Sequence, residues 1–88
     1  EKAVSWYFQS AKQKYKQAEF ALGTMYAAGS GVPQSNLIAF MWYSVSARNG
    51  YSKADDQRLI VAKRMTPEEL KRADIMSSDP LNFTDLEA

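Results

Sequence analysis

Cysteine and histidine are both absent from this sequence of 88 residues. Without cysteine, the chain forms no disulfide bond and has no thiolate nucleophile. Zinc sites draw mainly on cysteine and histidine, so a zinc site is not expected either. A general acid–base pair would have to come from Asp, Glu, Lys or Tyr. We therefore expect no catalytic residue, no metal and no cofactor in this chain.

Long apolar runs and a large charge of one sign are also lacking. No stretch approaches the roughly 20 apolar residues that a membrane-spanning helix needs. The formal net charge is only +1, whereas nucleic-acid-binding domains usually carry a strongly basic stripe. The composition therefore predicts neither membrane insertion nor nucleic-acid binding. A chain of this length forms one small domain with a thin core.

The sequence repeats itself at an offset of 36 residues. Residues 3–18 aligned with residues 39–54 give seven identities. These identities include two aligned Trp-Tyr pairs, Trp6-Tyr7 and Trp42-Tyr43. Periods of this length are typical of arrays in which helix pairs stack on one another. Beyond these ranges the match fades, as expected of a terminal unit with a more polar outer face.

Apolar spacing and capping residues predict five helices. Their predicted ranges are 1–13, 16–28, 37–49, 52–65 and 67–76. Gly29 is expected to end the second helix in a left-handed conformation, and Ser35 or Asn36 to cap the third. Thr66 and Glu69 predict a capping box at the start of the last helix. The adjacent pairs Asp55-Asp56 and Glu68-Glu69 are interpreted as helix surface and as a cap, because neighbours on a helix point about 100° apart.

Within these helices, four residues are expected to supply the apolar positions of the fourth helix: Leu59, Ile60, Val61 and Ala62. Leu70, Ala73 and either Ile75 or Met76 are expected to cover the open end of the stack with the fifth. Gly23 lies in the middle of a predicted helix, where glycine costs about 1 kcal/mol relative to alanine. Close approach of the neighbouring helix would offset this cost, and a flexible hinge is the alternative. Residues 77–88 are polar and acidic, and we expect them to form an extended or loose tail, with Leu81 and Phe83 as the residues that would pin it.

The repeated unit resembles the Sel-one-like repeat family, α-solenoids related to tetratricopeptide repeats. The matching positions are Ala18, Leu22, Gly23, Tyr26, Gly29, Gly31, Val32, Pro33, Ala39, Trp42, Ala47, Gly50 and Ala54. Two positions depart from the family pattern: Ser35 stands where Asp is usual, and Ser46 where Ala is usual. The resemblance covers residue 3 to about residue 64. It implies an all-α fold, a right-handed α-solenoid of antiparallel helix pairs.

The resemblance also implies an organisation of the chain. Residues 1–15 would be the second helix of a truncated repeat, and residues 16–51 a complete repeat. Residues 52–76 would be a partial repeat plus a C-terminal capping helix, and residues 77–88 a polar tail. Because the chain starts within a helical pattern, we expect an exposed apolar face centred on Trp6 and Val4. This face is expected to be covered by another chain, through self-association, or to continue into upstream repeats.

Most aromatic residues fall on the repeat pattern and are expected to be buried or half-buried. The residues beside the two tryptophans, Tyr7 and Tyr43, are expected to be partly exposed. Stacking on nucleic-acid bases or on sugars is the alternative for these side chains.

The resemblance implies a function, since such repeats usually hold partner proteins, often in bacterial envelope or regulatory systems and in eukaryotic membrane-protein quality control. We therefore expect a scaffold or adaptor that binds other proteins on its concave surface, which the first helices of the pairs line. The candidate partner-binding residues are Glu19, Phe20, Thr24 and Ala27. Packing between repeats is the other interpretation of Phe20. Alternative functions are the structural C-terminal cap of a longer repeat protein and the regulatory subunit of an enzyme.

Overall fold

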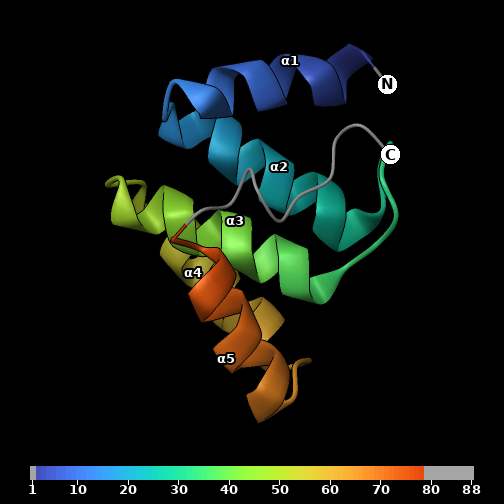
Figure 1. The fold of residues 1–88 in the computed structure, drawn as a ribbon, viewed down its shortest axis with the longest axis vertical. Coiled ribbons are helices and arrows are strands. Elements are labelled where there is room, and N and C mark those ends of the chain that lie inside the picture. The colour runs from blue at the N-terminus through green and yellow to red at the C-terminus, as the bar shows by residue number, and fades with distance from the viewer. Residues whose placement is uncertain (1, 79–88) are drawn as a thin grey trace.

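Helices are the only regular secondary structure in the described part of the chain. A computed structural model describes residues 2–78, with side chains described from residue 5 onward. Five helices follow one another along these residues (Figure 1). They are α1 (Lys2–Lys12), α2 (Lys16–Ala28), α3 (Asn36–Arg48), α4 (Ser52–Ala62) and α5 (Pro67–Met76). The predicted all-α fold of successive packed helix pairs is confirmed.

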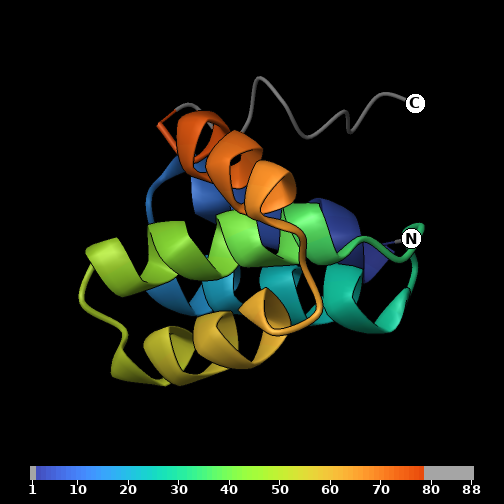
Figure 2. The same ribbon diagram turned by 90° about the horizontal axis from the view of Figure 1, so that it is seen from below.

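The helix α3 is the central element of the fold. It packs against α2 on one side and against α4 and α5 on others, and α1 packs on the far side of α2 (Figures 1 and 2). The helices α2 and α3 run in opposite directions because only a short turn joins them. The fifth helix crosses α3 instead of continuing the regular array beside α4.

Local signals fix the connection between α2 and α3. Gly29 ends α2 with φ of 72°, a left-handed conformation that glycine adopts without steric cost. The hydroxyl of Ser35 accepts a hydrogen bond of 3.1 Å from the backbone N–H of Ile38 and so caps α3. Both predicted caps are confirmed. The serine that replaces the usual aspartate therefore still performs the capping role.

The start of α5 has the predicted capping box. The backbone N–H of Glu69 donates to the Thr66 hydroxyl at 3.1 Å, and the Thr66 N–H donates to the Glu69 carboxylate at 3.0 Å. Pro67 occupies the first turn, where its missing N–H leaves no hydrogen bond unmade. Local chemistry thus accounts for the position at which this helix begins.

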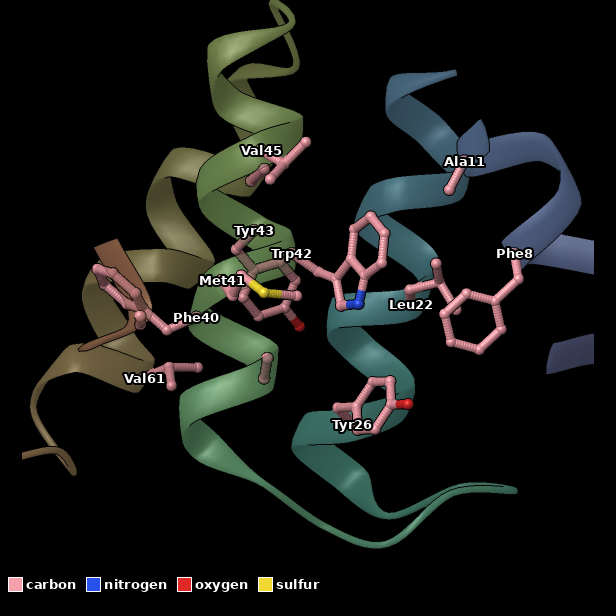
Figure 3. Close-up of a cluster of buried hydrophobic side chains, with 13 residues drawn as sticks. Phe8, Ala11, Leu22, Tyr26, Phe40, Met41, Trp42, Tyr43, Val45 and Val61 are labelled. Atoms are coloured by element: carbon pink, nitrogen blue, oxygen red, sulfur yellow. The ribbon is translucent and has the colours of Figure 1, made fainter. Parts of the chain in front are cut away.

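The core forms around Trp42, which points from α3 toward α2 (Figure 3). Its indole is fully buried beside Leu22, and the ring of Phe8 on α1 meets it edge-on with ring centroids 6.1 Å apart. The indole Nε1–H is buried and has no hydrogen-bond partner among the described residues. One side chain of α3 therefore joins three successive helices.

Gly23 lies where α2 and α3 approach closely. A Cβ atom at this position would lie 2.6 Å from Cδ1 of Tyr43, too close for any real contact. This geometry supports the interpretation of Gly23 as a packing residue. The side chain of Tyr43 is only 2% exposed, so the prediction that it is partly exposed is wrong. The ring fills the space that the missing glycine side chain leaves open.

The C-terminal helices differ from the prediction in two respects. Leu59 and Ile60 are exposed, so the prediction that they belong to the buried face of α4 is wrong. Only Ala54 and Val61 on this helix are buried, because the helix turns one narrow stripe toward α3. The helix also ends at Ala62, before the predicted residue 65, in a tighter turn in which the Arg64 N–H donates to the Val61 carbonyl.

The fifth helix covers α3 largely as predicted. Ala73 is fully buried, and Leu70 and Met76 pack against the core. Ile75 is instead exposed. The predictions that concern the side chain of Val4, and Leu81 and Phe83 in the tail, lie outside the described residues.

Candidate partner-binding surface

Glu19, the first candidate, lies between α2 and the end of α3. Its side chain is 1% exposed, so the prediction that it belongs to an open face differs from the structure. The amide of Asn49 donates hydrogen bonds of 2.8 and 3.1 Å to its two carboxylate oxygens. Burial raises the pKa of Glu19, while the Asn49 hydrogen bonds and the charges of Arg48 and Lys14 act in the opposite direction.

The same junction contains the second departure from the family pattern. The Ser46 hydroxyl is buried and donates a hydrogen bond of 2.7 Å to the backbone carbonyl of Lys16 at the start of α2. An alanine at this position has no hydroxyl to make that bond. Ser46 and the Asn49–Glu19 pair therefore both connect the end of α3 to the first turn of α2.

Phe20, the second candidate, lies in an aromatic cluster with Tyr43 and Tyr51. Its ring centroid is 5.4 Å from that of Tyr43 and 5.0 Å from that of Tyr51, in tilted and edge-on arrangements. Tyr51 immediately precedes α4, so the cluster joins the helix pair α2–α3 to the following helix. Phe20 remains half-buried. It combines the predicted packing between repeats with an apolar surface open to solvent.

Thr24, the third candidate, lies one helical turn after Phe20 and is exposed. Its hydroxyl accepts a hydrogen bond of 3.0 Å from the Tyr43 hydroxyl and donates one of 3.1 Å to the Phe20 backbone carbonyl. Ala27, the fourth candidate, is half-buried and packs against the core. The spacing of three and four residues places Phe20, Thr24 and Ala27 on one stripe of α2. We call these three residues the α2 stripe.

Three of the four candidates therefore share one stripe of α2, whereas the side chain of Glu19 is buried against the end of α3. Sequence reasoning missed the residues that position the stripe. Tyr43 and Tyr51 support Phe20, and their aligned positions in the repeat were the available signal. Asn49 donates a hydrogen bond to Glu19, and nothing in the sequence pattern identifies Asn49 as the partner of this carboxylate.

Further exposed side chains lie on α1 and on the turn that follows it. Trp6 is 72% exposed and Tyr15 is 55% exposed, and Tyr7 lies beside Trp6 on the same helix. Lys12 and Lys14 are exposed as well. The predicted exposure of Trp6 is confirmed.

Acidic residues form no metal centre in residues 2–78. No group of three or more metal-ligating side chains is found among the described residues. Asp55 is engaged by Arg58 in an ion pair, and Glu69 is used in the cap of α5. In the part of the chain that the structure describes, no helix is long and apolar enough to cross a membrane.

The helix pairs, the repeat period and the α1–α2–α3 packing define a helical-repeat protein. The Sel1 repeat family model matches residues 1–15 and 16–51. The chain therefore belongs to the Sel1 repeat family, whose repeats generally mediate protein–protein interactions. Searches of the curated proteins and of the solved structures find no match.

Proposed function

We propose that this chain is a scaffold or adaptor module that binds a partner protein on the α2 stripe. Membership of the Sel1 repeat family supports the class of function. The observation that carries the location is the half-buried ring of Phe20, which Tyr43 and Tyr51 hold in place beside the exposed Thr24. A rigid aromatic side chain of this kind is typical of the anchors that dominate protein interfaces.

Each predicted site residue has a distinct part in this proposal. Phe20 is the apolar anchor, Thr24 is a polar contact beside it, and Ala27 leaves room for a partner side chain. Glu19 contributes indirectly, because the hydrogen bonds that Asn49 donates to its carboxylate hold the start of α2 against α3. The module itself carries no catalytic role in this proposal.

A pull-down with the full-length protein tests the proposal. Thr24→Lys places a long charged side chain at an exposed position of the α2 stripe. It also removes the hydroxyl that accepts the Tyr43 hydrogen bond, so circular dichroism first checks that the variant is folded. Ser30→Lys adds the same charge in the exposed turn after α2 and serves as the matched control. We expect a partner that binds the wild-type protein and Ser30→Lys to be lost from Thr24→Lys. Equal capture by all three proteins would contradict the location.

The organisation of the C-terminal part is a second element of the proposal. We propose that residues 52–76 are a partial repeat followed by a capping helix, and that residues 77–88 form a polar tail. The Sel1 match ends at residue 51, and α5 packs across α3 instead of continuing the array. On this proposal the chain closes its own repeat stack at α5.

Self-association through the exposed face of α1 is a separate proposal. The 72% exposure of Trp6 favours it, because large exposed apolar side chains mark interaction sites when they occur in groups. Sedimentation velocity at several protein concentrations tests it. A single monomeric species at every concentration would exclude it and would leave the proposal for the α2 stripe unaffected.

A further inference from the structure

The helix α4 is the structural equivalent of α2 in the repeat. The two helices begin at positions that are related by the offset of 36 residues. The residues before them, Tyr15 and Tyr51, both have extended backbone, and the equivalent residues Ala18 and Ala54 are both buried. Both helices pack on α3, and they run in the same direction (Figure 2). Equivalent residues of α2 and α4 therefore face the same way.

Ile60 on α4 is the equivalent of Thr24 in the α2 stripe. Ile60 is 46% exposed, and Thr24 is exposed as well. The neighbours of the two helices differ, because α2 has a helix pair after it and α4 has a helix pair before it. The position is open in both settings. Stacking of further repeats on either side therefore does not account for, or remove, the exposure of this isoleucine.

Two basic side chains lie on the same row of the surface as Ile60. Lys53 precedes it by seven residues, about two helical turns, and Arg64 follows it by four. The turn after α4 keeps the helical sense, since the Arg64 N–H donates to the Val61 carbonyl. All three side chains of the row are exposed. We call Lys53, Ile60 and Arg64 the α4 row.

The charges around the α4 row indicate the chemistry of what binds there. Lys53 and Arg64 form no ion pair within the described residues. The α2 stripe carries no charge, and the acidic residue of α2, Glu19, is buried. Asp56 is exposed one turn before the isoleucine, so basic side chains still outnumber acidic ones on this surface. Charge complementarity therefore favours an acidic partner.

We propose that the α2 stripe and the α4 row form one surface that binds an acidic protein segment carrying a large apolar side chain. This inference rests on the proposed function, because the α2 stripe is half of the surface. The rings of Phe20 and Tyr51 are 5.0 Å apart, which places the start of α4 beside α2. The apolar side chain of the partner lies between Phe20 and Ile60, and its acidic side chains pair with Lys53 and Arg64.

Selection from a random peptide library displayed on phage tests the chemistry of this surface, with the full chain as the target. We expect the enriched peptides to contain a large apolar residue with Asp or Glu on both sides, and to be lost when Ile60→Ser is the target. Enrichment of neutral or basic peptides overturns the proposal. It is also overturned if no enriched peptide depends on Ile60.

Fluorescence anisotropy of the most enriched peptide then measures its affinity for single variants. Ile60→Ser should weaken binding by about tenfold or more, because it removes the apolar contact. Leu59→Ser is the matched control, since Leu59 is 53% exposed and points about 100° away from its neighbour on the helix. It should leave the affinity unchanged. Equal effects of the two substitutions overturn the proposal.

The charge contacts are tested in the same assay. Lys53→Glu should weaken binding severalfold and reduce its dependence on salt, because salt screens the charge pairs. Lys71→Glu makes the same change at an exposed position of α5 and should leave both quantities unchanged. Equal affinities and equal salt dependence in the two variants overturn the assignment of an acidic partner.

Thr24→Lys separates this inference from the proposed function. Loss of binding in both Thr24→Lys and Ile60→Ser supports a single surface across α2 and α4. If only Thr24→Lys weakens binding, the α2 stripe remains the binding site and the extension to α4 is wrong. If only Ile60→Ser weakens binding, the α2 stripe is not part of the surface and the proposal falls. If neither does, the α2 stripe and the α4 row are both wrong.

Discussion

At the scale of single residues, the buried carboxylate of Glu19 makes a prediction about pH. Burial raises its pKa in the folded chain above the ordinary value of 4.5, so the folded state binds this proton more tightly than the unfolded state. Above the raised pKa the carboxylate is charged in both states, and its burial destabilises the fold. As the pH falls from the raised pKa toward 4.5, this destabilisation is relieved.

The substitution Glu19→Gln should therefore remove one component of the pH dependence. At a pH above the raised pKa, the free energy of unfolding of the variant relative to the wild type should be at its highest. Below pH 4.5 this relative free energy should be lower, because protonation of Glu19 removes the cost of burying its charge in the wild type. Urea unfolding across this range measures the difference, with the exposed Glu68→Gln as the control. A difference that does not vary with pH would contradict the raised pKa.

Gly23 makes the second prediction at this scale. In an open helix, Gly23→Ala would stabilise the chain by about 1 kcal/mol. Here the new Cβ would meet the ring of Tyr43 at 2.6 Å, and overpacking typically costs about 1–3 kcal/mol. We expect net destabilisation, measured by urea unfolding. In a Tyr43→Ala background the clash is gone, so Gly23→Ala should become neutral or stabilising. Stabilisation in the wild-type background would instead support the hinge interpretation.

At the scale of helices, the hydrogen-bonded cap of α5 can be tested alone. Thr66→Ala removes the hydroxyl that accepts the Glu69 N–H and should lower the free energy of unfolding by about 1 kcal/mol. Thr66→Ser and Glu69→Gln keep groups that can make the two bonds of the box, and both should have smaller effects. Chemical denaturation of the three variants provides the measurement. Equal losses in all three would show that the helix start does not depend on the box.

The helices show which features of this fold can be predicted from the sequence. The bounds of α2 and α5 follow the prediction residue for residue, because Gly29 and Thr66 act on their own neighbours in the chain. The degree of exposure of Tyr43, which is buried, and of Leu59, which is exposed, was not predictable in the same way. It depends on which helix packs on which face, and a short apolar segment fits several faces equally well.

The candidate site shows the same division. The stripe of Phe20, Thr24 and Ala27 follows from helical spacing on a recognised repeat unit. The burial of Glu19 does not, because it depends on an amide thirty residues further along the chain, at Asn49. Contacts between the end of one helix and the start of another leave no periodic signal in the sequence.

At the scale of the whole molecule, α1 has one side that packs against the core and another side that faces solvent. Phe8 is 4% exposed and packs against Trp42, whereas Trp6, two residues earlier, points to solvent. Truncation of a buried phenylalanine typically costs about 3–5 kcal/mol, and substitutions at exposed positions usually stay within about 0.5 kcal/mol. The stability of a domain is itself only about 5–15 kcal/mol. Contact with α1 therefore contributes a large part of the stability of this small core.

We accordingly expect Phe8→Ala to destabilise the chain severely and Trp6→Phe to change its stability little. Urea unfolding gives both values. In a Trp6→Phe background, the emission of the remaining Trp42 reports on the core directly. Its maximum should lie at a short wavelength typical of a buried indole, and Phe8→Ala should shift it to longer wavelength. If Phe8→Ala changed neither stability nor emission, α1 would not be part of the cooperative unit. The packing of α1 and α2 around Trp42 would then not be the main source of stability of the repeat stack.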